Sequence, residues 1–198
     1  MNTFKVQKRD METKAKKLRR EGYVTGNLFG KEIEGSVLLK IERKEAERMQ
    51  RECMKGSQVM LDLDGQSYDV LIKEMDYDPA KNMLMEIDFQ ALVSNEKVHS
   101  VAEIVLVNHD KLEAGVLQQH LEEISFRALP SALVDKIMVD VGDMKVGDVI
   151  KVKDLAIAQD KDVDLKTDLE AAVVSVAAVH VDPALEAEEE AAAEEEAK

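Results

Sequence analysis

Short runs in which apolar and polar residues alternate recur through the first 90 residues, and this period is typical of half-buried β-strands. Between residues 4 and 30 the pattern predicts a strand, a short basic helix and a second strand, which occupies residues 24–29. A third strand is predicted at residues 36–41, after a loop that contains Gly30 and Gly35. The chain therefore begins with strands that are closely spaced along the sequence.

A β-hairpin gives the clearest signal in this half of the chain. Residues 59–63 and 68–72 both alternate, and the turn-forming pair Asp64-Gly65 separates them. Asp78-Pro79 marks a further turn, after which residues 82–90 supply another strand. Several strands, one hairpin and two helices within about 90 residues favour a small α+β or barrel-like domain.

The two helices are predicted where the apolar residues follow a helical period instead. In the first, Met11, Ala15 and Leu18 share one face, and basic residues cover the rest of the surface. The second helix is predicted at residues 43–54, with Gly56 as a stop signal just beyond it. Its apolar side consists of Ala46, Met49, Cys53 and Met54.

Beyond a short polar joint at residues 93–97, the chain is predicted to be mostly β. Strands are expected at residues 98–107, 124–129, 136–141, 149–152 and 171–181. Residues 115–121 fit either an edge strand or a helical turn. From Pro183 onward the composition is Ala and Glu apart from Leu185 and Lys198, without an apolar stripe that could pack. We therefore predict domains at residues 1–92 and 93–182, followed by a disordered acidic tail at residues 183–198.

Charge is unevenly distributed along the chain. The formal net charge is −14, yet residues 1–22 contain eight basic and three acidic side chains, a net charge of +5. Residues 91–198 carry the whole acidic excess, with 10 basic and 24 acidic residues. A concentrated cationic surface in an acidic protein favours a polyanionic partner, and phosphate is the commonest polyanionic group. The alternative is a solvated basic helix that has no partner.

Catalytic and metal-binding motifs are absent from the sequence. There is no G-x-S-x-G motif and no glycine-rich phosphate loop, and the four histidines lack a metal-ligand spacing. Cys53 is the only cysteine and lies on an apolar helix side, so we expect a core residue rather than a nucleophile. No apolar run approaches the roughly 20 residues needed to cross a bilayer. A cytoplasmic, non-enzymatic protein is expected, with no cofactor, metal, membrane or small-molecule substrate.

Three segments of the sequence carry a family resemblance. They read KLRREGYVTGNLFGKE near the start, KEMDYDPAKNMLMEIDFQAL at the end of the first domain, and GVLQQHLEEISFRALPSALVDKIMVDVGDMKVGDVIKVKDL in the second. Together they resemble the bacterial large-subunit ribosomal proteins numbered twenty-five, in the two-domain form known as general stress protein CTC. The resemblance extends from residue 4 to residue 180.

The resemblance implies a mainly β fold with short helices (α+β). Its N-terminal six-stranded β-barrel would bind 5S rRNA at the irregular region called loop E, and a mostly β domain would follow. It implies a structural component of the large ribosomal subunit that contacts neighbouring ribosomal proteins and catalyses no reaction. The RNA-binding positions that it carries over are Arg9, Lys14, Lys17, Arg19, Arg20, Phe29 and Asp88.

The resemblance also suggests a role for each kind of RNA-binding position. The cations are expected to contact phosphate and sugar, while Asp88 is expected to accept a hydrogen bond from a base edge or a 2′-hydroxyl. The alternative for Asp88 is a residue at a strand end that bonds to its own backbone.

Three positions depart from the family pattern. Phe29 replaces a tyrosine, Glu86 replaces a histidine, and Asp76-Tyr77 replaces a Gln-Arg pair. Each lost or repulsive contact is expected to cost about 1–3 kcal/mol of RNA-binding free energy. These departures leave two alternatives open: a stress-linked protein interaction module on the same fold, with weakened or lost RNA binding, and an enzyme without a recognisable motif.

Overall fold

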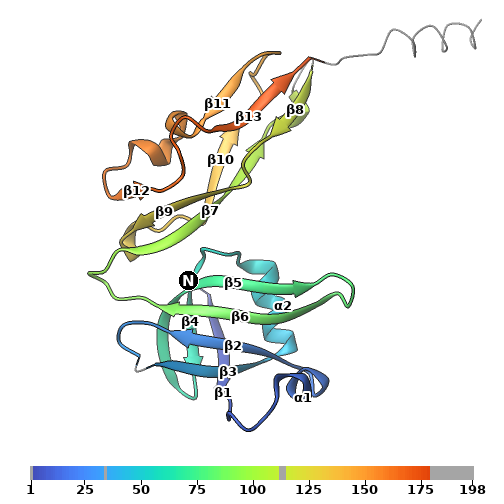
Figure 1. Cartoon of the computed structure of the whole chain (residues 1–198), viewed down its shortest axis with the longest axis vertical. Helices are drawn as coiled ribbons and strands as arrows, with labels where there is room; N and C mark the ends of the chain where they lie inside the picture. Colours follow the sequence, from blue (N-terminus) through green and yellow to red (C-terminus); the bar gives the residue numbers. More distant parts are fainter. Residues whose placement is uncertain (1, 34, 112–114, 179–198) are drawn as a thin grey trace, which may run out of the picture.

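The computed structural model of the chain describes residues 2–33, 35–111 and 115–178. Its first six strands form a closed barrel in the order β1-β3-β2-β6-β5-β4 (Figure 1). These strands are β1 (Thr3–Lys8), β2 (Tyr23–Phe29), β3 (Ser36–Glu42), β4 (Gln58–Leu63), β5 (Gln66–Asp78) and β6 (Met83–Ala91). Parallel pairing of β1 with β4 closes the barrel. The predicted mainly β fold with a six-stranded barrel is confirmed.

The alternation along these strands fills the barrel with apolar side chains. Residues of a barrel strand point inward and outward in turn, so every second residue enters the core. The fully buried side chains include Phe4, Leu28, Leu39, Ile41, Leu61, Ile87 and Phe89. Burying each such side chain stabilises the fold by about 1.5–3 kcal/mol.

The predicted hairpin is formed by β4 and β5. Asp64 and Gly65 both have a positive φ, at 51° and 92°, as a tight two-residue hairpin turn requires. β5 continues well past the predicted end at Ile72 and reaches Asp78. Its register with β6 shifts after Ile72 and after Asp76, and these bulges interrupt the apolar–polar alternation on which the prediction relied.

Two helices accompany the barrel, α1 (Ala15–Arg20) and α2 (Arg43–Glu52). In α2 and directly after it, Ala46, Met49 and Cys53 are buried, as predicted. For α1 the predicted apolar face is wrong at Met11, which precedes the helix and is 84% exposed. The segment before the helix forms a turn instead, so Leu18 is the buried residue that docks α1.

Two smaller sheets form the second domain. One has the order β10-β7-β9-β12, and the other has the order β11-β13-β8. The strands are β7 (Val98–Val107), β8 (Val116–Gln119), β9 (Glu123–Ala128), β10 (Lys136–Asp140), β11 (Val149–Lys151), β12 (Val163–Leu165) and β13 (Ala172–Ala177). Of the two alternatives for residues 115–121, the edge strand is correct. The predicted tail at residues 183–198 lies outside the described residues.

The barrel and the second domain touch where the segment before β4 meets β7. The carbonyl oxygen of Val101 lies so close to Gly56 that a Cβ atom at Gly56 would be 2.0 Å from it. The Lys73 ammonium donates to the His99 carbonyl at 2.8 Å, and the Ser57 hydroxyl donates to Asp135 at 3.4 Å. The two domains therefore meet through direct backbone and side-chain contacts.

Candidate nucleic-acid interface

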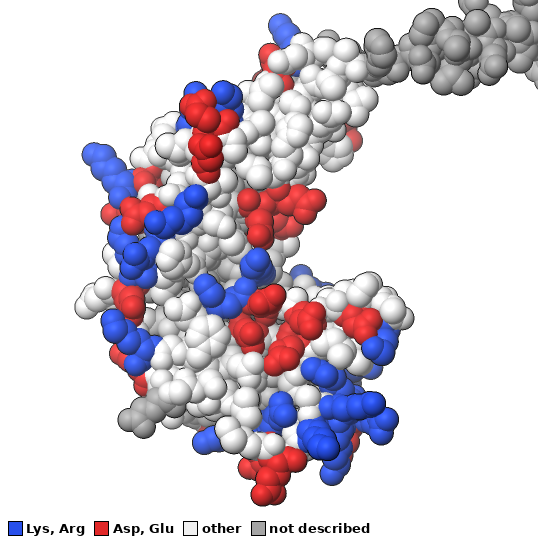
Figure 2. Space-filling view, viewed as in Figure 1, with Lys and Arg blue, Asp and Glu red and all other residues white. Residues whose placement is uncertain are grey.

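Helix α1 presents the basic residues of the N-terminal segment to solvent. Leu18 is 5% exposed and fixes the helix to the barrel beside β2, while Lys14, Lys16, Lys17 and Arg20 are exposed. Figure 2 shows Lys and Arg side chains gathered over this end of the barrel. Lys17 forms an ion pair with Glu21 at 3.8 Å. Within the described residues, Lys14, Lys16 and Arg20 form no ion pair, so their charges are available to a partner.

Arg19 differs from its neighbours because its guanidinium binds the barrel. It donates to the Met85 carbonyl at 3.2 Å and to the Thr25 hydroxyl at 3.3 Å, and it lies 3.9 Å from the Glu86 carboxylate. The Thr25 hydroxyl also donates to the Met85 carbonyl, at 3.2 Å, and Thr25 is buried. Arg19 therefore fixes the C-terminal end of α1 onto β2 and β6, with part of its charge offset by Glu86.

Arg9 holds the turn that leads into α1. Its Nε and Nη2 donate to the Thr13 carbonyl at 3.2 and 2.9 Å, and its backbone N–H donates to the Leu38 carbonyl at 2.8 Å. A guanidinium has five N–H donors, so this bidentate contact leaves donors free. Arg9 positions Lys14 and α1 and retains the capacity to contact a phosphate.

A row of outward-facing side chains crosses the barrel beside α1. The strand register places Leu38 of β3, Asn27 of β2, Asp88 of β6 and Glu74 of β5 next to one another. The Asn27 amide donates to Asp88 Oδ1 at 2.9 Å and also to Glu86 Oε1 at 3.0 Å. Asp88 thus lies in the middle of β6 and is oriented by a side chain, not by its own backbone.

Four carboxylates face outward together on β5 and β6. Glu74 lies opposite Asp88 and Asp76 lies opposite Glu86, and the four residues line a pocket of about 240 Å³. We call them the acidic quartet; Figure 2 shows acidic side chains on the barrel beside the basic group over α1. The interface is therefore bipolar, with cations on the helix and anions on the adjoining strands.

The candidate positions do not all lie at one point. Arg19 and Asp88 are brought together, because both neighbour Glu86. Phe29 is half-buried and lies two residues beyond Asn27 along the same outward side of β2, next to Gln90. Sequence reasoning missed Asn27 and Glu74; the hairpin and strand patterns did not predict which strands pair, so nothing indicated that these two flank Asp88.

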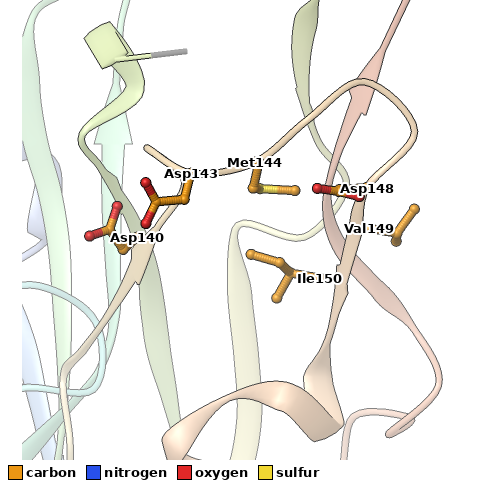
Figure 3. Close-up of a pocket in the computed structure, with 6 residues that line it drawn as sticks. All are labelled: Asp140, Asp143, Met144, Asp148, Val149 and Ile150. Atoms are coloured by element: carbon orange, nitrogen blue, oxygen red, sulfur yellow. The ribbon is translucent and has the colours of Figure 1, made fainter. Parts of the chain in front are cut away.

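A second pocket, of about 410 Å³, lies in the second domain where the turn after β10 meets β11 (Figure 3). It is lined by Asp140, Asp143, Met144, Asp148, Val149 and Ile150. The Asp140 carboxylate accepts the Gly142 N–H at 2.9 Å and the Asn108 amide at 2.8 Å, and both bonds lower its pKa. Asp148 accepts the Lys145 N–H at 2.8 Å. Two of the three carboxylates therefore stabilise turns.

Cys53 is a free, buried cysteine directly after α2. Burial raises the pKa of the Cys53 thiol, which disfavours the nucleophilic thiolate. No group of three or more His, Cys, Asp or Glu among the described residues is suited to hold a metal ion. Within the same residues, no helix is long and apolar enough to cross a membrane.

Each of the two domains matches a known protein family or domain. The Ribosomal L25p family matches residues 4–89, and the C-terminal domain of ribosomal protein TL5 matches residues 97–180. A large ribosomal subunit protein bL25 from Geobacillus thermodenitrificans is 35% identical over 142 residues, which are 71% of this chain and 67% of that protein.

Relatives with the same description match nearly the whole chain. The bL25 protein of Listeria monocytogenes is 31% identical over 180 residues, 89% of this chain and 86% of the relative. That of Finegoldia magna is 30% identical over 182 residues, 89% and 85% of the two chains. The barrel, the second domain and these matches together show that the chain belongs to the L25p family of large-subunit ribosomal proteins, in its two-domain form, a family of ribosomal proteins and not of enzymes.

Proposed function

We propose that this protein is a structural component of the large ribosomal subunit that binds 5S rRNA in its loop E region. The observation that carries the proposal is the bipolar interface, in which exposed cations on α1 adjoin an oriented Asp88 carboxylate. An A-form-like RNA helix offers a shallow minor groove with 2′-hydroxyls and flanking phosphates, and proteins recognise it by shape and polar contacts.

Each part of the interface suits one part of such an RNA. Lys14, Lys17 and Arg20 project from a docked helix and suit phosphates, whereas Arg19 supports that helix from beneath. Asp88 uses one oxygen for Asn27, and a carboxylate has about four lone-pair sites, so it can still accept from a 2′-hydroxyl or a base amino group. The acidic quartet repels phosphate and so favours the orientation in which the RNA backbone lies over α1.

A salt titration of RNA binding tests the proposal. A labelled loop E oligonucleotide should bind the full chain with an affinity that falls steeply as salt rises, because bound counterions are released. Arg20→Gln should weaken binding and reduce the slope of log K against log salt by about 0.7–0.9. Lys161→Gln is the matched control, because Lys161 is an exposed lysine of the second domain.

Two results would contradict this function. One is an absence of binding by the wild-type protein in dilute buffer, and the other is an equal effect of Arg20→Gln and Lys161→Gln. The acidic quartet favours a second candidate, a protein interaction module on the same fold, because four carboxylates reduce affinity for a polyanion. In that case the endogenous protein should sediment apart from the large subunit, whereas the proposed function places it in the large-subunit fraction.

A further inference from the structure

A pocket of about 230 Å³ lies between the two domains. Its barrel side is the segment before β4 and the middle of β5, and its other side is formed by β7, β9 and the residue after β12. Neither α1 nor the acidic quartet lines it. A water molecule occupies about 30 Å³ of liquid, so the pocket has room for several waters or for one compact polar group.

Three lysines line this pocket. Lys55 and Lys73 come from the barrel, and Lys166 comes from the second domain. Lys55 lies 3.4 Å from the Glu123 carboxylate, and Lys73 donates to the neutral carbonyl of His99 at 2.8 Å. No ion pair of Lys166 occurs among the described residues. Three lysines and no carboxylate therefore line the pocket, in a protein whose net charge is −14.

The electrostatic environment of Lys73 also favours an anion in this pocket. Burial lowers its pKa, and the positive charge of Lys55 lowers it further. Its principal partner is a carbonyl, which carries no charge to offset the ammonium. Leu71, Ile72 and Phe126 form apolar parts of the lining, and apolar surroundings strengthen electrostatic attraction by reducing the local dielectric constant. An anion in this position would offset the repulsion between Lys55 and Lys73.

We propose that the pocket between the domains binds a phosphate group through Lys73, Lys166 and Lys55. Phosphate suits the site because three ammonium groups can each donate to a different oxygen, and Ser125 also lines the pocket. Because Lys73 and Lys166 belong to different domains, the bound phosphate links them directly. This site is separate from the proposed RNA interface on α1, so either can fail without the other.

Thermal unfolding of the full chain in inorganic phosphate tests the site. Phosphate should raise Tm above the value in chloride of the same ionic strength, because a ligand that binds only the folded state stabilises it. Lys166→Gln should weaken phosphate binding by about tenfold or more, since it removes a charge-assisted contact. Its side chain has no hydrogen bond or ion pair in the described part of the chain, so the substitution should leave the fold intact.

Matched variants exclude phosphate binding elsewhere. Lys161→Gln removes one exposed positive charge of the second domain outside the pocket and should retain the full phosphate effect. Lys145→Gln removes another exposed positive charge of the second domain outside the pocket and should retain it too. Backbone amide NMR shifts on phosphate addition should concentrate at Gly56, Ser100 and Lys166, which line the pocket.

The source of the phosphate is distinguished by a second arm with loop E RNA. If the group belongs to the RNA backbone, Lys166→Gln should also weaken RNA binding and reduce its salt slope by about 0.7–0.9. If it is a free phosphate or a small phosphate ester, RNA binding should be unchanged in Lys166→Gln. The proposal is overturned if both arms fail. The phosphate arm fails if phosphate and chloride stabilise the protein equally, or if Lys166→Gln keeps the full phosphate effect. The RNA arm fails if RNA binding is unchanged in Lys166→Gln.

Discussion

At the scale of single residues, Arg19 and Arg20 illustrate how neighbouring arginines of one basic segment serve different purposes. Arg19 donates to the Met85 carbonyl and the Thr25 hydroxyl, and only about a fifth of its side chain is exposed, at 21%. Arg20 is exposed and lies on the solvent side of the same helix. One residue holds the interface in place, and the other is available to a ligand.

Alanine substitutions should separate these two purposes. Arg19→Ala leaves the Met85 carbonyl and the buried Thr25 with one donor fewer and should lower the free energy of unfolding by about 1–3 kcal/mol. Arg20→Ala should change it by less than about 0.5 kcal/mol, as surface substitutions usually do. Urea denaturation measures both values. Equal stability of the two variants would show that Arg19 does not fix α1.

Glu170 should make stability depend on pH in the acidic range. The ammonium groups of Lys153 and Lys151 donate to its carboxylate at 2.8 and 2.9 Å and lower its pKa from 4.5 to about 2. A group whose pKa is depressed by folding stabilises the folded state above its unfolded pKa. The contribution is therefore complete above pH 4.5 and is lost as the pH falls toward 2.

The corresponding variant is Glu170→Gln, which should be less stable than the wild type at neutral pH. Unfolding midpoints measured from pH 7 to pH 2 should converge, because protonation removes the same charge from the wild-type carboxylate. A gap between the two proteins that stays constant down to pH 2 would contradict the role of Glu170.

The role of a residue could be predicted from the sequence only where that role depends on its neighbours along the chain. The basic character of residues 1–22 follows from composition, and the exposure of Lys14 and Arg20 is consistent with it. The contacts of Arg19 with Met85 and of Asn27 with Asp88 join positions about 60 residues apart. They depend on β2 pairing with β6, which no local pattern encodes.

At the scale of elements, β5 and β6 pair like charges directly. Glu74 faces Asp88 and Asp76 faces Glu86, and like charges opposite each other destabilise a sheet. Asn27 and Arg19 offset part of this repulsion on the β6 side. The acidic quartet therefore lowers stability and, under the proposed function, also limits affinity for RNA.

Neutralising the β5 members of the quartet should improve both properties. The double variant Glu74→Gln/Asp76→Asn keeps Asn27, Glu86 and Asp88 in place and should raise the free energy of unfolding by roughly 0.5–1 kcal/mol. It should also tighten binding to the loop E oligonucleotide. The double variant Glu32→Gln/Glu122→Gln neutralises two exposed acids outside the quartet and controls for the change in net charge. A fall in stability of the double variant would show that the quartet is stabilised by interactions other than those described.

Element prediction succeeded where apolar and polar residues keep a regular period. The β4–β5 hairpin has unbroken alternation and a turn that the pair Asp64-Gly65 favours, so it was predictable. β12 has only three residues, too few for its alternation to stand out from the surrounding sequence, and it was missed. The start of α1 was misplaced because Met11 has the helical spacing, while a turn that Arg9 stabilises through Thr13 delays the helix to Ala15.

At the scale of the whole molecule, the relation between the domains depends on a close backbone approach at Gly56. Its φ is 88°, a left-handed value, and a Cβ atom there would lie 2.0 Å from the Val101 carbonyl oxygen. Glycine is therefore required twice, for the conformation and for the space. Contacts of Lys73 and Lys55 with the second domain surround this point.

Gly56→Ala should loosen the two domains from each other. The left-handed conformation alone costs an alanine roughly 1–2 kcal/mol, and the clash with Val101 adds to it by displacing β7. Gly65→Ala is the matched control, because Gly65 has a φ of 92° but no neighbour within 4 Å of its Cβ position. NMR relaxation should give two different rotational correlation times for the two domains in Gly56→Ala, and one common value in Gly65→Ala. Identical tumbling in both variants would contradict the role of Gly56.

The position of β6 in the barrel constrains how the nascent protein can fold. β6 is the last barrel strand to be synthesised, yet it lies between β2 and β5 and bonds to both. Until Ala91 has left the ribosome, β2 and β5 each keep an unpaired edge, and such edges promote aggregation. Fragments that stop before Met83 should therefore be insoluble. The barrel can close only in one late step, when β6 is added between β2 and β5.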